Sequence, residues 1–108
     1  MSLTKKKCVP CECGVPPLTN GEAKKLLKEI PRWFLEDKKI KRIFKFKNFV
    51  EAMKFVNNVA ELSEQEGHHP DIGIQYNKVT LALWTHSIEG LSENDFILAS
   101  KIEPLIEK

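Results

Sequence analysis

The chain has 108 residues and a net charge of +2, with 42% hydrophobic and 30% charged residues. This length suits one domain with a modest core, and the composition is typical of a globular protein. The charge predicts no particular partner, and the densest basic run, 38–42, lacks the interleaved aromatic residues of a nucleic-acid surface. No apolar segment has the length to span a bilayer. We therefore expect a cytoplasmic protein that binds neither nucleic acid nor membrane.

The first 17 residues differ from the rest of the chain. They contain the three cysteines, Cys8, Cys11 and Cys13, among proline and glycine residues. A C-x-x-C spacing can serve redox chemistry or metal binding, but three thiols leave a tetrahedral site one ligand short. We expect residues 1–17 to form a flexible arm, with zinc completed by a histidine or by another subunit as the alternative. The folded domain is predicted to span 18–108.

Regular patterning begins with Thr-Asn-Gly-Glu at 19–22, a capping box that predicts a helix ending at Pro31. Segments 33–36 and 40–47 predict a hairpin, and 71–75 and 78–85 predict a second one. A last helix is expected after the N-cap Ser92. The order helix, two strands, helix, two strands, helix predicts an α+β fold: a two-layer sandwich of a four-stranded antiparallel sheet with three helices on one face.

The longest predicted helix lies between the hairpins, from Phe49 to about Gly67. Its apolar residues cover about half of the circumference, which is more than one sheet requires. They are Phe49, Ala52, Met53, Phe55, Val56, Val59, Ala60 and Leu62. This width predicts a second neighbour, which is either another subunit contacted through Val56 or Val59, or a thick core within one subunit.

The three histidines of the chain, His68, His69 and His86, fall within nineteen residues. His68 and His69 precede one strand of the second hairpin and His86 follows the other, so antiparallel pairing is expected to bring the rings to the same end of the sheet. Imidazole donates and accepts protons near neutral pH, because its unperturbed pKa is about 6.5. Acid/base chemistry without a metal is the favoured interpretation.

Other interpretations of the histidines stay open. A His-His-Pro sequence is also typical of a solvated loop. Glu64 precedes His68 by four residues, so a helix that persists to Gly67 would put both on one face, and the carboxylate could orient the ring. Such a pair is equally a structural device. Zinc is the third interpretation, but the usual H-E-x-x-H spacing is absent.

Four strings of residues carry a family resemblance: His-His-Pro-Asp at 68–71, Tyr-Asn-Lys-Val at 76–79, Thr-His at 85–86 and Gly-Leu-Ser-Glu-Asn-Asp at 90–95. They resemble the pterin-4a-carbinolamine dehydratases, from about residue 18 onward. The resemblance implies a hydro-lyase that converts a 4a-hydroxytetrahydropterin to quinonoid dihydropterin and water, in tetrahydrobiopterin-type cofactor recycling. It implies no bound cofactor or metal, and a homodimer paired through sheets or a homotetramer assembled through the long helices.

The same resemblance implies roles for individual residues. His68 and His86 are expected to be the acids that serve the two faces of the pterin ring, and His69 to bind pterin and relay protons. Glu64 matches the carboxylate that supports the first of these histidines. Loss of the 4a-hydroxyl group requires an acid for the leaving oxygen and a base for the N5 proton, which is work that imidazoles perform near pH 7.

Pro70, Trp84 and Thr85 complete the expected substrate-binding or supporting set. Two positions depart from the family pattern. Gly67 stands where some relatives have an acidic residue, and Trp84 replaces a small residue of the animal enzymes, where it could narrow the site or stack on the pterin. A non-catalytic pterin-binding or dimerising module of the same fold is the alternative function, although a scaffold would need none of the histidines.

Overall fold

The computed structural model describes residues 18–85 and 90–107, with no account of the Glu107 side chain. The cysteine arm and His86 lie outside the described residues, so the expectations for Cys8, Cys11, Cys13 and His86 stay predictions. Within the described ranges, the predicted order of elements and the α+β architecture are confirmed.

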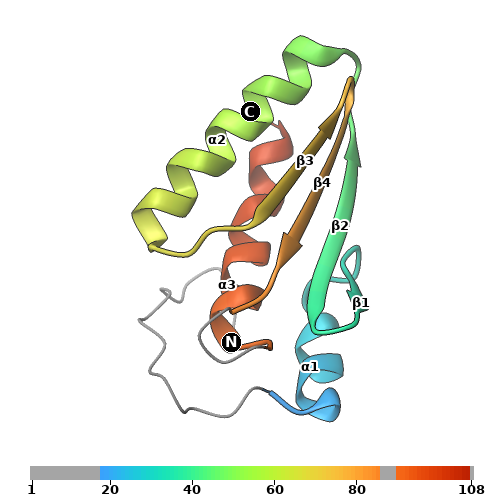
Figure 1. Cartoon of the computed structure of the whole chain (residues 1–108), viewed down its shortest axis with the longest axis vertical. Helices are drawn as coiled ribbons and strands as arrows, with labels where there is room; N and C mark the ends of the chain where they lie inside the picture. The colour runs from blue at the N-terminus through green and yellow to red at the C-terminus, as the bar shows by residue number, and fades with distance from the viewer. Residues whose placement is uncertain (1–17, 86–89, 108) are drawn as a thin grey trace.

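The sheet has four antiparallel strands in the order β1-β2-β4-β3, and helices cover one of its faces (Figure 1). The long crossover through α2 places β3 outside β4 rather than beside β2. The elements are α1 (Asn20–Leu27), β1 (Phe34–Glu36), β2 (Lys39–Lys45), α2 (Phe49–Glu66), β3 (Asp71–Gln75), β4 (Lys78–Leu83), α3 (Glu93–Ile102) and the 3-10 helix η3 (Glu103–Glu107).

Local hydrogen bonds explain where the first helices begin. The Thr19 hydroxyl accepts from the Glu22 backbone N–H at 3.2 Å, and Glu22 Oε1 accepts from the Thr19 N–H at 2.9 Å. This capping box satisfies backbone groups that a helix N-terminus leaves without partners. Asn48 caps α2 in the same way, through the Glu51 N–H at 2.9 Å. Helix α1 ends at Leu27, earlier than Pro31, and Ile30 is buried within the turns that follow.

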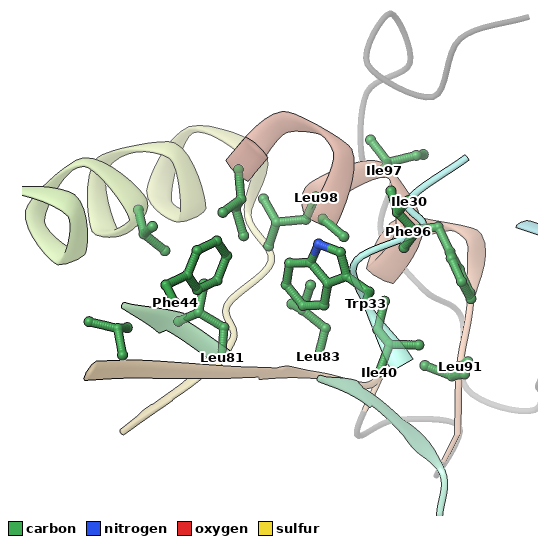
Figure 2. Packing of buried hydrophobic residues seen from close by; sticks show 14 of the residues in the cluster. Ile30, Trp33, Ile40, Phe44, Leu81, Leu83, Leu91, Phe96, Ile97 and Leu98 are labelled. Atoms are coloured by element: carbon green, nitrogen blue, oxygen red, sulfur yellow. The ribbon is translucent and has the colours of Figure 1, made fainter. Parts of the chain in front are cut away.

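Strand register decides which side chains enter the core. Ile40 pairs with Leu83 and Phe44 with Val79, and all four are buried on the helix-covered face. Figure 2 shows sheet residues of this row below Leu98 of α3. Because side chains alternate along a strand, the intervening residues of β2 and β4 lie on the opposite, open face. The sheet therefore supports one hydrophobic layer only.

Only part of the wide apolar arc of α2 is buried within the subunit, because Phe49 and Ala60 are exposed. Val59 is fully buried in the core, and Val56 packs partly buried against it. Helix α2 contacts β4, α3 and η3. The chain's own C-terminal segment is thus a second neighbour of α2, and Val59 does not face another subunit, because it has no exposed surface. A valine at this position is needed for the core of a single chain. A contact of Val56 with another subunit stays a prediction.

A partly buried ion pair, between buried Arg42 and half-buried Glu103, attaches the C-terminal segment to the sheet. Arg42, on the core face of β2, is bonded to Glu103 Oε1, which also accepts from Trp33 Nε1 at 3.0 Å. The Arg42 guanidinium lies 4.2 Å from the centroid of the Phe44 ring. Burial, with a smaller contribution from the charge of Arg32, lowers the pKa of Arg42. Without Glu103, a charge in the core would lack its counter-ion.

We expect Glu103→Gln to lower the free energy of unfolding by about 2 kcal/mol, because it removes a charged hydrogen-bond partner from a buried arginine. Urea denaturation measures the change. Glu36→Gln is the matched control: its ion pair with Lys41 is largely exposed, so its loss should change the free energy by less than about 0.5 kcal/mol. If the two substitutions lowered the free energy of unfolding equally, the burial of Arg42 would not explain the effect of Glu103→Gln.

Candidate active site

Gly67 ends α2 and redirects the chain just before the histidine pair. Its φ of 66° and ψ of 27° are left-handed, a conformation that favours glycine over residues with a Cβ atom. The N–H groups of Gly67 and His68 both donate to the Ser63 carbonyl, the latter at 3.2 Å. His68 and His69 consequently leave the helical path. This geometry gives a structural reason for glycine at position 67.

His68 is oriented by a carboxylate from a distant part of the sequence. Its Nε2 lies 2.6 Å from Oδ1 of Asp95, at the start of α3. The Asp95 side chain has no exposed surface and that of His68 is 14% exposed. An ionised carboxylate only accepts hydrogen bonds, so His68 donates through Nε2, and Nδ1 is the ring nitrogen that does not face Asp95.

Asp95 is held by two further donors. Its Oδ2 accepts from the Thr85 hydroxyl at 3.0 Å and from the Ser92 N–H at 2.9 Å. The hydroxyls of Thr85 and Ser92 lie 2.8 Å apart, so Ser92 can donate to Thr85 while Thr85 donates to Asp95. Three segments meet at this one side chain: the loop after α2, the end of β4 and the N-terminus of α3. The carboxylate is thereby fixed in plane and position.

Asp95 was not among the predicted site residues, although it ends the string 90–95 that carries the family resemblance. The signal that could have found it is its place three residues after the N-cap Ser92, where an acidic side chain folds back toward the backbone. Thr85, which was predicted as a supporting residue, lies in the same network. Its substrate contact stays a prediction.

His69 has a different partner and a different environment. Its Nε2 lies 2.5 Å from Oε2 of Glu64, and the two side chains are 58% and 78% exposed. The expectation that Glu64 orients His68 is wrong, because the left-handed turn at Gly67 carries His68 away from the helix face and brings His69 back to Glu64. The two neighbouring histidines thus form separate pairs, one with a buried carboxylate and one with an exposed carboxylate.

Pro70 and Trp84 are the other predicted site residues within the described ranges. Pro70 is half-buried immediately before β3. Trp84 is half-buried after β4, packs against the core and has the Lys39 ammonium 5.1 Å from its ring centroid. Stacking of Trp84 on a pterin stays a prediction.

Within residues 18–85 and 90–107, no three His, Cys, Asp or Glu side chains are grouped so that they could hold a metal ion. None of the helices in 18–85 and 90–107 combines the length and apolarity needed to cross a membrane.

The sequence of the chain matches a known protein family. The family model described as pterin 4 alpha carbinolamine dehydratase matches residues 16–105. The chain belongs to the pterin-4a-carbinolamine dehydratase family. It is accordingly an enzyme of the hydro-lyase class. The resemblance read from the histidine strings is confirmed.

Relatives of this dehydratase family match nearly the whole chain. A Methylococcus capsulatus protein is 55% identical over 106 residues, covering 96% of this chain and 93% of its own length. A Halorhodospira halophila protein is 50% identical over 107 residues, covering 97% and 98%. Both are named provisionally as pterin-4-alpha-carbinolamine dehydratases.

Solved structures share the fold. A crystal structure from Brucella melitensis, described as a transcriptional coactivator/pterin dehydratase, has 35% identity and a TM-score of 0.79, and the match covers 82% of this chain and 97% of that one. A pterin dehydratase-like RuBisCO assembly factor of the alpha-carboxysome matches with 22% identity and a TM-score of 0.58 over 69% of this chain and 87% of its own. This second similarity shows a shared fold only.

We expect Gly67→Ala to lower the free energy of unfolding by about 1 kcal/mol, because the left-handed conformation strains a residue with a Cβ atom even where space is free. Gly21→Ala is the matched control: it lies inside α1, has room for a Cβ atom, and should stabilise the protein by up to about 1 kcal/mol. Urea denaturation of both variants tests this. A Gly67→Ala variant as stable as Gly21→Ala would refute the argument from left-handed geometry.

Proposed function

We propose that this enzyme dehydrates a 4a-hydroxytetrahydropterin to the quinonoid dihydropterin by histidine acid/base catalysis, in cytoplasmic recycling of a tetrahydrobiopterin-type cofactor. The observation that carries the proposal is the 2.6 Å bond between His68 and the buried Asp95. An imidazole held in one tautomer, with one nitrogen facing away from its carboxylate, is the arrangement of a general acid or base. Family membership supplies the substrate class.

The reaction breaks the bond between C4a and the hydroxyl oxygen and removes the proton from N5. The electron pair of the N5–H bond becomes the new C4a–N5 π bond, while the pair of the C–O bond leaves with oxygen. Protonated Nδ1 of His68 gives its proton to the leaving oxygen, which departs as water. A neutral imidazole takes the N5 proton. One proton enters and one leaves, so the residues require no bound cofactor or metal for this step.

The remaining predicted residues keep proposed roles. His86 is the candidate for the second acid, serving the opposite face of the ring. Pro70 shapes the entrance to β3 and Trp84 offers an aromatic surface for the flat pterin. Thr85 acts through Asp95, because its hydroxyl donates to that carboxylate.

We expect His68→Ala to lower turnover on a synthetic 4a-hydroxytetrahydropterin by about 100-fold or more, the usual contribution of a general acid. Gln65→Ala, an exposed change in the last turn of α2, should leave turnover and the circular dichroism spectrum unchanged. The rate is followed by ultraviolet absorbance of the product. Near-normal turnover of a His68→Ala, His86→Ala double variant would contradict histidine catalysis.

We also propose that the enzyme is a homodimer formed at the β3 edge, and that dimers can pair further into a homotetramer. Strand β3 lies at the sheet edge with every residue exposed, including Ile72 and Ile74. A regular edge strand offers unpaired backbone groups to a second strand, and apolar side chains beside it favour burial. The other edge, β1, has only three residues.

Light scattering of the unmodified protein should therefore give a mass of at least two chains. Ile74→Lys is expected to yield monomers, because a lysine on an edge strand opposes strand pairing. Ile43→Lys is the matched control, since this exposed isoleucine lies on the inner strand β2. A monomeric unmodified protein, or dissociation by both substitutions alike, would count against the β3 edge.

A further inference from the structure

We propose that Glu64 and His69 form a proton-exchange route that connects the acid/base site to the solvent. In this role Glu64 acts through His69 rather than on the substrate. The inference rests on the proposed dehydration and assigns Glu64 a function that differs from orienting His68. It follows from the contrast between the two histidine pairs.

The environment of each pair determines where its protons can go. On the Nε2 side of His68, Asp95 is fully buried and its Oδ2 is occupied by donors from Thr85 and Ser92. Thr85 is itself buried. Ser92, at the far end of the network, is only half-buried. A proton from Nε2 would therefore have to cross buried Asp95 and Thr85 to reach the solvent, a longer path than the exposed carboxylate of Glu64 offers to His69.

The second pair has the opposite character. Glu64 accepts from Nε2 of His69 at 2.5 Å and has 78% of its side chain exposed. Imidazole can accept a proton at one ring nitrogen while it releases another from the second nitrogen. His69 can therefore take a proton at Nδ1 and pass one from Nε2 to Glu64, from which water or buffer removes it.

Dehydration makes such a route useful in every turnover. His68 has one nitrogen directed away from Asp95, and this nitrogen cannot hold the N5 proton until it has given its own proton to the leaving oxygen. If His69 receives the N5 proton while His68 protonates the oxygen, His69 finishes with one extra proton and His68 lacks one. The extra proton of His69 leaves through Glu64, and Nδ1 of His68 is reprotonated from solvent after the product departs.

Stability offers little reason for the Glu64–His69 pair. Both partners are mostly exposed, and exposed ion pairs contribute little to folding free energy because solvent screens the charges. Replacing the carboxylate should consequently leave the fold unchanged. A Glu64→Gln variant retains the size of the side chain and a carbonyl acceptor for His69, but it cannot carry a proton.

The test measures turnover on a synthetic 4a-hydroxytetrahydropterin against buffer concentration at constant pH and ionic strength. In dilute buffer, Glu64→Gln should be slower than the unmodified enzyme by about tenfold, with KM unchanged. Added imidazole buffer should restore its turnover, whereas an equal ionic strength of sodium chloride should not. Glu61→Gln, an exposed charge removal one turn earlier in α2, should show neither the loss nor the rescue.

Each other outcome overturns the inference. Full turnover of Glu64→Gln in dilute buffer would mean that protons leave by another path. A loss that imidazole does not restore, or one that appears as a raised KM, would assign Glu64 to structure or binding. If the unmodified enzyme has no dehydratase activity, the proposed function fails and the inference fails with it. An active unmodified enzyme whose Glu64→Gln variant shows no buffer dependence would contradict the inference alone, so the two failures can be distinguished.

Discussion

The buried carboxylate of Asp95 is the interaction on which the site depends. It receives His68 on one oxygen, and Thr85 and the Ser92 backbone on the other. An unpaired carboxylate would be costly to bury, so all of these partners must be present for it to remain inside. The loop after α2, the end of β4 and the start of α3 are therefore assembled together, and helix capping and ring orientation use the same side chain.

This arrangement explains how two adjacent histidines can do different work. His68 is tied to a buried partner and presents one nitrogen, whereas His69 is tied to an exposed partner and retains contact with water. Two consecutive residues with such different surroundings require a tight turn of the backbone before them. The left-handed conformation of Gly67 provides that change. The conformation of Gly67 thus decides which carboxylate each histidine faces.

Most of the fold could be predicted because its signals are local. The capping box at Thr19, the helix end at Gly67 and the alternation of Val79 and Leu81 each depend on a few neighbouring residues, and the structure confirms them. The helix start after Ser92 is also confirmed. Failures came where tertiary contacts decide. A wide apolar arc fits a second subunit or the chain's own C-terminal segment equally well, and the pattern around Val59 contains nothing that separates them.

The site shows the same division between local and distant causes. Glu64 was paired with the wrong histidine because the four-residue rule assumes that a helix continues, and one left-handed residue is enough to invalidate it. The partner of His68 could not be found from spacing, since Asp95 is 27 residues away and reaches it only when α3 is docked on the sheet. Sequence patterns thus selected two histidines that the structure places beside carboxylates, but the way in which each is held depends on where separate elements end. Because the site is built from such ends, the exposed pair of Glu64 and His69 lies apart from the hydrophobic layer. Substitutions at this pair are therefore expected to leave the packing of that layer unchanged.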